Sequence, residues 1–311
     1  MSVPLSRPLM QVSVLLATRR RAELLGQTLA AMAHMSTVDL AWELVVVDNE
    51  GETTTREVCE SFADRLPLRY LVCRTPGQNA ARNYGLSAVR GELVVLSDDD
   101  MLPDADWLRE LYQGAKRWPE HVLFGGRSLP NWPGKVPDFE IDEDIGHWTY
   151  CICDPPLLEG PDPRFLPIST NMAIRRRVFE YGLTFDESIG PNGRDYAMGS
   201  ETEFNVRLGR LGFTAVFLPK AVVHNVVQAD QLDRKWVLGR AFREGRGETR
   251  LQAPLSWCVL ARLTKRALWA TARYSWGRIR HCRSDLFRRR ISCALTRGRL
   301  YEAWLLKLGR R

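Results

Sequence analysis

The segment GELVVLSDDDMLPDADW, residues 91–107, decides how the chain is interpreted. A short apolar run over residues 93–96 is followed almost directly by Asp98, Asp99 and Asp100, and a helix is predicted to begin near Asp104. Such a run is typical of a strand buried on both faces, as in a parallel sheet. Three adjacent carboxylates repel one another, and a divalent cation with phosphate oxygens in its shell would offset that repulsion. Alternatively, the aspartates only form a turn and cap the next helix.

Strands and helices alternate through the first 126 residues. The sequence predicts strands over residues 12–17, 43–47, 69–73, 93–96 and 122–126, and helices over residues 23–35, 54–66, 77–89 and 104–118. This alternation predicts a doubly wound α/β fold with a mostly parallel sheet and flanking helices. No GxGxxG or GxxxxGK[ST] motif follows these strands, so neither a dinucleotide-binding fold nor a P-loop ATPase is supported.

Polar residues follow three of these strands at the point where each strand ends. They are Thr18 with Arg19, Asp48 with Asn49, and the three aspartates at 98–100. In an open α/β sheet, ligands bind at the carboxyl ends of the strands. A site with both basic and acidic groups at this edge would suit a nucleotide together with its metal ion.

The positive charge of the chain is concentrated in its last 58 residues. The whole chain carries +7, but residues 254–311 hold 15 Lys and Arg against Asp285 and Glu302, which gives +13. The first 253 residues then hold 29 basic and 35 acidic side chains, or −6. We therefore expect a main domain over residues 1–250 and a basic helical tail over residues 251–311. The tail's charge indicates an anionic partner, either a membrane surface or nucleic acid.

Helices are expected over residues 255–281 and 286–308 of this tail. Its basic residues are spaced by three, four or seven, and tryptophans are interspersed. No stretch reaches the roughly 18 to 20 apolar residues that span a bilayer. Such a pattern is typical of an interfacial helix attracted to anionic lipid. Alternatively, the two helices pack on the main domain with an arginine-rich outer face.

The seven cysteines are irregularly spaced, and the N-terminus, MSVPLSRPLM, does not resemble a signal peptide. Reduced thiols in the cytoplasm are therefore the simplest expectation. Cys151 and Cys153 follow His147, but this spacing is not a usual zinc pattern. Residues 131–167 form a long segment with little periodicity. Its aromatic side chains either stack on a sugar or pack the segment itself; they are Trp132, Phe139, Trp148 and Tyr150.

Several motifs, in the expected order, resemble those of inverting family 2 glycosyltransferases with the GT-A fold. They are VSVLLATRRR, VVVDNE, GQNAARNYGL, the DxD element at 98–100, STNMAIRR, TFDESIG, GSETEF and the strand that ends at His224. The resemblance covers roughly residues 10–250. One departure is the first motif, where the family more often has Pro-Thr-Tyr-Asn in place of residues 17–20.

The resemblance implies roles for particular residues. Thr18 and Asp48 would line the nucleotide base pocket, with Asp48 accepting hydrogen bonds. The remaining donor-site residues would be Arg19, Arg82, Asn83, Asp98 at the ribose, and Asp99. Asp100 would ligate Mg²⁺ or Mn²⁺ at the diphosphate, and His224 would reach the metal or the diphosphate. Asn171 and Met172 would line the sugar or acceptor pocket, although a structural role fits them equally.

An inverting transfer also needs a base that takes the proton of the acceptor hydroxyl. The family usually has Gly-Glu-Asp at a helix start, and this chain has Gly199, Ser200 and Glu201. The resemblance therefore implies Glu201 as the base, one methylene longer than the usual aspartate. Asp195 and Glu203 are alternatives. Glu201 would otherwise only favour the helix dipole.

Together these observations predict a metal-dependent inverting glycosyltransferase. It would move a sugar from a nucleoside-diphosphate donor to a glycan or lipid-linked acceptor in polysaccharide or cell-envelope biosynthesis. We expect it in the cytoplasm, peripheral to the inner face of the cytoplasmic membrane, without a specific nucleic-acid partner. The alternatives are a sugar-1-phosphate nucleotidylyltransferase, which would need a glycine-rich signature near the first strand, and a non-catalytic glycan-binding relative.

Overall fold

The computed structural model describes residues 10–193, 195–279 and 286–309, and the chain forms two compact units. Unit 1 comprises the residues up to Asn131 with Cys151–Glu187 and Glu201–Val226, and unit 2 comprises Trp132–Tyr150, Ser188–Ser200 and the residues from Val227 onward. The units are not divided at residue 250. The expected separation of a catalytic domain from a tail at that point stays a prediction.

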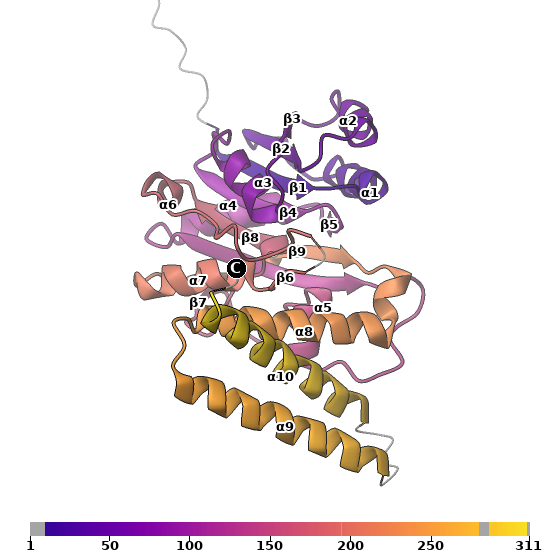
Figure 1. Ribbon diagram of the computed structural model, residues 1–311. Helices are drawn as coiled ribbons and strands as arrows, with labels where there is room; N and C mark the ends of the chain where they lie inside the picture. Colours follow the sequence, from indigo (N-terminus) through magenta and orange to yellow (C-terminus); the bar gives the residue numbers. More distant parts are fainter. Residues whose placement is uncertain (1–9, 194, 280–285, 310–311) are drawn as a thin grey trace, which may run out of the picture. The chain divides into compact units, whose positions relative to one another are not determined.

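Unit 1 contains a single sheet of nine strands (Figure 1). Its parallel part runs in the order β3-β2-β1-β4, with bounds β1 Val12–Thr18, β2 Trp42–Asp48, β3 Leu68–Val72 and β4 Leu93–Asp98. The sheet continues through β8 Met172–Arg175, β6 Leu123–Asn131, β9 Ala215–Val226 and β5 Met101–Pro103, while β7 Gly160–Pro161 pairs with β9. The expected strands are present. In addition, β8 lies antiparallel between β4 and β6, which the strand pattern of the sequence does not predict.

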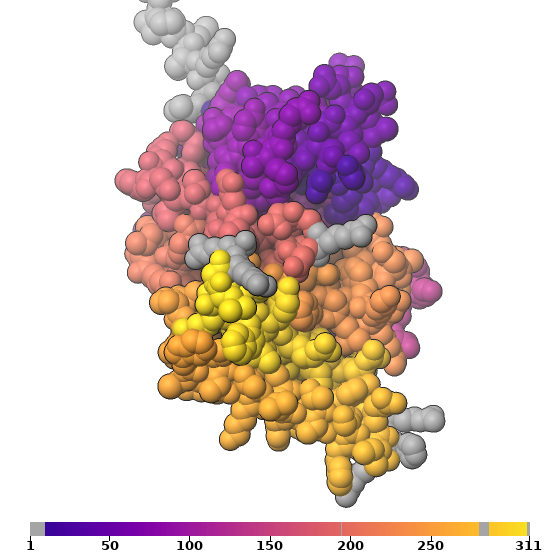
Figure 2. All heavy atoms as spheres, viewed as in Figure 1, coloured from indigo at the N-terminus to yellow at the C-terminus, as the bar shows by residue number. Residues whose placement is uncertain are grey.

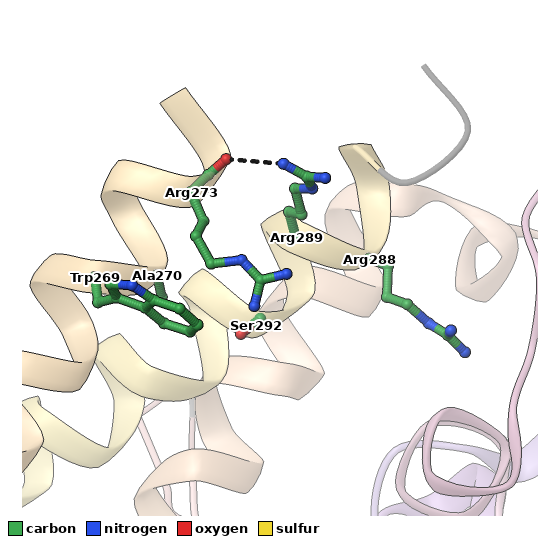
Figure 3. A pocket seen from close by; sticks show the side chains of 6 residues that line it. All are labelled: Trp269, Ala270, Arg273, Arg288, Arg289 and Ser292. Atoms are coloured by element: carbon green, nitrogen blue, oxygen red, sulfur yellow. Dashed lines mark hydrogen bonds between the residues drawn. The ribbon is translucent and has the colours of Figure 1, made fainter. Parts of the chain in front are cut away.

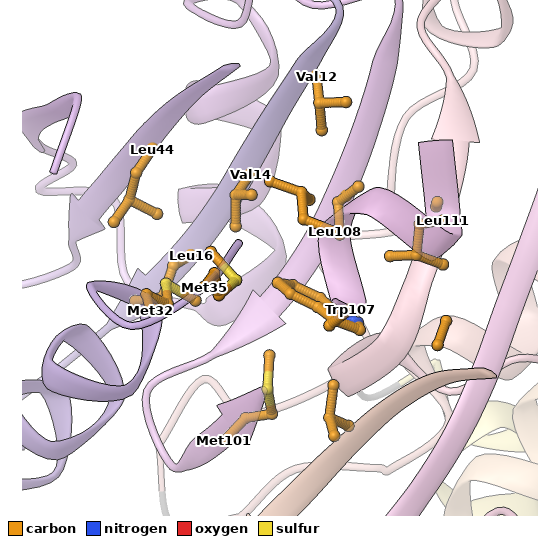
Figure 4. Close-up of a cluster of buried hydrophobic side chains, with 14 of the residues drawn as sticks. Val12, Val14, Leu16, Met32, Met35, Leu44, Met101, Trp107, Leu108 and Leu111 are labelled. Atoms are coloured by element: carbon orange, nitrogen blue, oxygen red, sulfur yellow. The ribbon is translucent and has the colours of Figure 1, made fainter. Parts of the chain in front are cut away.

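Helices cover the sheet of unit 1, and they are α1 Ala22–Met32, α2 Thr53–Glu60, α3 Gln78–Leu86, α4 Trp107–Arg117, α6 Arg177–Glu180 and α7 Ser200–Arg210, with a short 3₁₀ turn η1 Ser169–Asn171. Alternate residues of β1 enter two different apolar clusters, Val12, Val14 and Leu16 in one and Leu15 in the other. The first cluster also contains Trp107 of α4 (Figure 4). A sheet with an apolar cluster on each face is the doubly wound arrangement that the strand pattern predicts.

Unit 2 is helical, with α5 Glu143–Tyr150, η2 Ala229–Leu232, α8 Arg234–Leu251, α9 Trp257–Ile279 and α10 Leu286–Lys307. The two expected tail helices are present, and residues 280 and 281 of the first lie outside the described residues. Glycines let α8 and α10 touch: a Cβ on Gly245 would lie 2.1 Å from the Leu295 carbonyl oxygen, and one on Gly298 would lie 2.0 Å from that of Phe242. None of the described helices has the length and apolarity that crossing a lipid bilayer requires.

Three aromatic residues of the long segment 131–167 pack on other rings within unit 2; they are Trp132, Phe139 and Tyr150. Trp132 meets Tyr150 edge-on at 5.0 Å between ring centroids, and Tyr150 stacks on Trp236 at 6.0 Å. Phe139 lies 4.7 Å from Phe287 of α10. These contacts support the packing alternative for these side chains, because each of these rings already has an aromatic neighbour.

Candidate active site

Three parallel strands bring the polar residues at positions 18, 48 and 98 to one edge of the sheet. Thr18 is the register partner of Asp48 in the β1–β2 ladder, and Ala17 is the partner of Asp98 in the β1–β4 ladder. Since the strands run in the same direction, their carboxyl ends stop at nearly the same level. This is the edge at which open α/β sheets bind their ligands.

The acidic turn between β4 and β5 is held by Thr18 and Arg21. The Thr18 hydroxyl donates to Asp99 Oδ2 at 2.6 Å, and the Arg21 guanidinium donates to Asp99 Oδ1 at 2.6 Å and to Asp100 Oδ2 at 2.7 Å. Arg21 directly precedes α1, and its side chain does not cap that helix. The sequence motifs assign no role to Arg21, yet this residue supplies positive charge to the carboxylates.

Arg19 points to a different partner. Its Nε donates to Glu50 at 2.8 Å, and Arg20 donates to the same carboxylate at 2.6 Å. Both arginine side chains are exposed. They bind a carboxylate of the loop that follows β2, and not the aspartates. A contact between Arg19 and a nucleotide sugar stays a prediction.

Burial and mutual repulsion shift the protonation of the acidic turn. Burial, with the neighbouring charge of Asp100, raises the pKa of Asp99 to about 7, and Arg21 and Thr18 offset only part of that rise. Burial also raises the pKa of Asp100, against the lowering effect of Arg21. Burial lowers the pKa of Arg21, but the charges of Asp100 and Asp99 outweigh this effect, and the pKa is raised overall. One guanidinium is therefore too little positive charge for this cluster, and a further cation would be favoured there.

Arg82 of α3 reaches the same cluster from the helix that follows β3. Its side chain is 1% exposed, and its Nη2 donates to Asp98 Oδ1 at 3.0 Å, an oxygen that also accepts from Gln78 at 3.1 Å. Among the described residues, the other terminal nitrogen, Nη1, has no hydrogen-bond partner. Leaving a buried donor unpaired costs about 1–3 kcal/mol. An anionic oxygen of a ligand would satisfy it.

Asp48 and Asn49 organise the loops around the strand ends. Asp48 is fully buried and accepts hydrogen bonds from the Glu50 and Glu52 N–H groups, each at 2.9 Å, and from the Tyr70 hydroxyl at 2.7 Å. Asn49 donates to the carbonyls of residues 73 and 75 and accepts from the N–H of Gly77 at 2.8 Å. Gly77 has φ of +125°, which favours glycine at this entrance to α3. The role of Asp48 in base recognition stays a prediction.

The amides of Asn83 and Asn171 are used within the fold. Asn83 Nδ2 donates to the Phe185 carbonyl and to Glu187 Oε1, each at 2.9 Å, and its Oδ1 accepts from the Phe185 N–H. Asn171 is fully buried, donates to two carbonyls at 2.8 Å and accepts from the Trp107 indole at 2.8 Å. These contacts favour the structural role for Asn171. They also mean that Asn83 would have to exchange partners to contact a nucleotide.

His224 lies beside the acidic turn on β9. β5 pairs with β9 so that Leu102 is the partner of His224, and the Val226 N–H donates to the Asp100 carbonyl at 2.7 Å. The imidazole Nε2 lies 3.0 Å from Asp104 Oδ1. The structure thus brings His224 to the segment that carries Asp100, but its observed partner is Asp104.

The predicted base, Glu201, stands in the first turn of α7. Its two alternatives are both paired: Glu203 forms an ion pair with Arg207 at 2.6 Å, and Asp195 forms one with Arg246 within unit 2. Glu201 has no hydrogen bond or ion pair to another described residue. Of the three candidates, it is the carboxylate whose oxygens are available to a ligand.

The residues of the acidic turn fit a divalent cation that also binds phosphate. In the part of the chain that the structure describes, no three His, Cys, Asp or Glu side chains are grouped as a metal site. Mg²⁺, however, is usually held by one or two carboxylates together with substrate phosphates and water. Asp98 and Asp100 keep 16% and 15% of their side chains exposed, so both carboxylates remain accessible from solvent.

The sequence profile of the family described as "Glycosyl transferase family 2" matches residues 13–183. Among individual proteins, the chain is 28% identical over 254 residues to the succinoglycan biosynthesis protein ExoM of Rhizobium meliloti, a match that covers 78% of this chain and 76% of that protein. It is 24% identical over 241 residues to the glucosyl-dolichyl phosphate glucuronosyltransferase of Haloferax volcanii, with 76% and 75% covered.

Solved structures share the fold. The mannosyltransferase PcManGT from Pyrobaculum calidifontis, in complex with GDP-Man and Mn²⁺, aligns with a TM-score of 0.56 at 17% identity, covering 92% of this chain and 86% of that one. TarS 1–349 of S. aureus, in complex with UDP-GlcNAc, aligns with a TM-score of 0.55 at 12% identity, covering 96% and 92%. These similarities confirm the GT-A-type fold expected from the sequence.

Proposed function

The chain belongs to glycosyl transferase family 2, and from this premise we propose a metal-dependent, inverting transfer of a sugar from a nucleoside-diphosphate donor to a glycan or lipid-linked acceptor. That the protein is a glycosyltransferase follows from the family. The metal, the inversion, the donor and the acceptor are what we propose. The family match favours this activity over a sugar-1-phosphate nucleotidylyltransferase, and the intact acidic turn argues against a non-catalytic relative.

The observation that carries the proposal is the pairing of an under-neutralised acidic turn with an unpaired buried arginine nitrogen. Asp98 and Asp100 can share a divalent cation with a diphosphate, while Arg82 Nη1 offers a donor to an anionic oxygen. Both features call for the same ligand, one that is anionic and binds metal. Thr18, Arg19, Asp48, Asn83 and Asp99 would complete the nucleotide-sugar site, with His224 beside the metal.

In the proposed reaction, the acceptor hydroxyl oxygen forms a bond to the anomeric carbon of the donor sugar while the bond from that carbon to the diphosphate oxygen breaks. Attack from the opposite face inverts the anomeric configuration. Glu201 takes the proton of the acceptor hydroxyl, and the nucleoside diphosphate leaves with both electrons of the broken bond. Mg²⁺ or Mn²⁺ held at Asp100 would stabilise the charge on this leaving group.

The relatives suggest where such a reaction would serve. ExoM is named for succinoglycan biosynthesis, and the Haloferax enzyme is named as a glucosyl-dolichyl phosphate glucuronosyltransferase. We propose by analogy a role in polysaccharide or cell-envelope biosynthesis, in the cytoplasm at the inner face of the cytoplasmic membrane. The structural relatives bind UDP-GlcNAc and GDP-Man, so both nucleotides belong in a donor screen.

Thermal unfolding with UDP and GDP, each with Mn²⁺ or with EDTA, tests the donor site. We expect stabilisation by one nucleotide that requires the metal. Stabilisation by a nucleoside triphosphate with a sugar 1-phosphate, and not by a diphosphate, would support the nucleotidylyltransferase instead.

The base is tested by Glu201→Gln, which should lower transfer at least a hundredfold while metal-dependent nucleotide binding persists. Glu60→Gln, at an exposed position of α2, is the matched control and should retain activity. Unchanged turnover in Glu201→Gln would exclude this residue as the base.

A further inference from the structure

Helix α9 has an apolar face on each side. Leu260, Leu263, Ala267 and Ala270 are buried within unit 2. On the opposite side lies a row of exposed side chains, which we call the outward stripe. It consists of Leu268, Trp269, Ala272, Trp276 and Ile279. Leu268 is 68% exposed and Ile279 is 71% exposed, and side chains of α9 project from the molecular surface in Figure 2. Single exposed apolar residues are ordinary, but a contiguous row marks an interaction surface.

The ionisable side chains of α9 are dominated by basic residues, and the charged ones are Arg262, Lys265, Arg266, Arg273 and Arg278. None of these five forms an ion pair with another described residue. At 100° per residue, Arg262, Arg266 and Arg273 fall along one flank of the outward stripe. The surface is therefore apolar along its centre and positively charged along its side.

A cleft next to the stripe adds arginines from α10. It has a volume of about 210 Å³ and is lined by Trp269, Ala270, Arg273, Arg288, Arg289 and Ser292. The Arg273 guanidinium lies 4.6 Å from the centre of the Trp269 ring, and Arg289 Nη1 donates to the Arg273 carbonyl at 3.2 Å. Figure 3 shows Arg273 extending towards α10, whereas Arg288 points away from Trp269 and bonds to Asp142 at 2.5 Å. Arg288 and Arg289 thus already make contacts within unit 2. The guanidinium of Arg273 and the hydroxyl of Ser292 also line the cleft, and both groups are donors that suit a phosphate oxygen.

These features select one kind of partner. Nucleic acid would use the arginines, but it would leave the Leu, Ile and Trp side chains of the stripe unburied. A protein partner would have to bring both an apolar groove and several carboxylates to face five basic residues. A bilayer with anionic lipids offers both properties at once: an interface that accepts Trp and Leu, and phosphates for the arginines.

We propose that the outward stripe of α9, with the adjoining arginine cleft, docks the protein on a lipid bilayer that contains anionic lipids. Leu268, Trp276 and Ile279 enter the interface, and Arg273 receives a lipid phosphate. The inference rests on the proposed function only in that a lipid-linked acceptor would give such docking a purpose. It assigns the surface of the tail that makes the contact.

Vesicle flotation of the full-length protein tests the docking. We expect flotation with phosphatidylcholine vesicles that contain about 30% phosphatidylglycerol, weaker flotation at high salt, and none with phosphatidylcholine alone. The variant Leu268→Ser/Trp276→Ser/Ile279→Ser should reduce the floated fraction at least tenfold, and Arg273→Gln several-fold. The absence of flotation of the native chain on anionic vesicles would overturn the proposal.

Matched controls change exposed side chains in unit 1. Val38→Ser/Leu158→Ser removes apolar residues that are 94% and 91% exposed in unit 1, and Arg177→Gln removes an exposed charge there. Both controls should float like the native chain. If the stripe variant floats equally well, the surface is wrongly assigned. If it instead lowers the mass of an oligomer in solution while flotation is unchanged, the stripe binds a second copy.

Two further measurements separate the remaining explanations. Inorganic phosphate, compared with chloride at equal ionic strength, should leave flotation unchanged; full displacement by phosphate would mean that the cleft binds free phosphate rather than a membrane. Metal-dependent hydrolysis of nucleotide sugars, assayed without vesicles on the same samples, should be unaffected by the stripe variant. Flotation without hydrolysis would refute the proposed function alone, and hydrolysis without flotation would refute the docking alone.

Discussion

Replacing Asp99 by asparagine tests whether the acidic turn is built to hold a cation. The Asp99 side chain is 4% exposed and accepts hydrogen bonds from Thr18 and Arg21. Asparagine keeps the shape and one acceptor oxygen, which can stay on Arg21. The Thr18 hydroxyl can reverse and accept from the new amide nitrogen, since a hydroxyl both donates and accepts. The substitution therefore removes a charge without leaving an obvious gap.

The sign of the effect follows from the raised pKa. Asp99 has a pKa of about 7 in the folded chain against an ordinary value of 3.8. Between these values the folded state keeps a proton that the unfolded state has lost, so the free energy of unfolding falls as the pH rises from about 4 to about 7. At 1.36 kcal/mol per pKa unit, the loss is on the order of 4 kcal/mol. An asparagine side chain cannot ionise, so the Asp99→Asn variant escapes this loss.

Urea unfolding in EDTA, measured between pH 4.5 and 8, checks this prediction. Asp99→Asn should be nearly as stable as the native chain at the lowest pH and more stable by up to about 4 kcal/mol at pH 8. Asp64→Asn, at an exposed position, should show no such trend. Mn²⁺ with the preferred nucleotide should stabilise the native chain more at pH 8 than at pH 6, because cation binding favours the ionised carboxylate. A variant that is less stable than the native chain at pH 8, or a difference independent of pH, would refute the reasoning.

Three other substitutions address single contacts. Arg82→Met removes the donor to Asp98, and nucleotide affinity in isothermal titration should fall at least tenfold; an unchanged affinity would remove Arg82 from the donor site. Glu302→Ala leaves Arg246 without its buried partner. Urea unfolding should show that the free energy of unfolding falls by about 3–5 kcal/mol, as expected for a broken buried ion pair. A fall below about 1 kcal/mol would mean that the pair does not hold α10 in place. His224→Ala should weaken Mn²⁺ binding several-fold if the imidazole binds the metal. The free energy of unfolding should change by less than about 1 kcal/mol, because the pair of His224 with Asp104 is exposed. An unaltered Mn²⁺ affinity would mean that His224 only pairs with Asp104.

The parallel half of the sheet could be predicted from the sequence because its strands are short apolar runs, most of which end in polar residues. From their positions at the strand ends, Thr18, Asp48 and Asp98 are predicted to lie at one edge of the sheet, and the structure has them there. The antiparallel strand β8 could not be predicted, because its pairing with β4 and β6 depends on contacts distant in sequence.

The partners of individual side chains at the site were harder to predict. Three consecutive arginines follow β1, and their spacing does not reveal which one reaches the aspartates. The turn directs Arg19 and Arg20 to Glu50 and leaves Arg21 for Asp99. Asn83 posed a similar difficulty, because its partners at Phe185 and Glu187 lie about a hundred residues away. Motif resemblance identifies positions near a ligand, but hydrogen-bond geometry decides which of them are free to bind it.

The charge of the tail illustrates the same distinction between counting residues and placing them. Residues 254–311 carry +13, yet part of this charge is neutralised within unit 2. Arg299 is paired with Glu248 of α8, which removes one positive charge from this count. The single acid of α10, Glu302, is buried and paired with Arg246 and Arg250, two arginines of α8 that lie outside residues 254–311. These pairs hold α10 against α8 and contribute little to any external field. The basic residues of α9 have no such partners among the described residues, so the attraction for an anionic surface is concentrated on the helix that also exposes tryptophan.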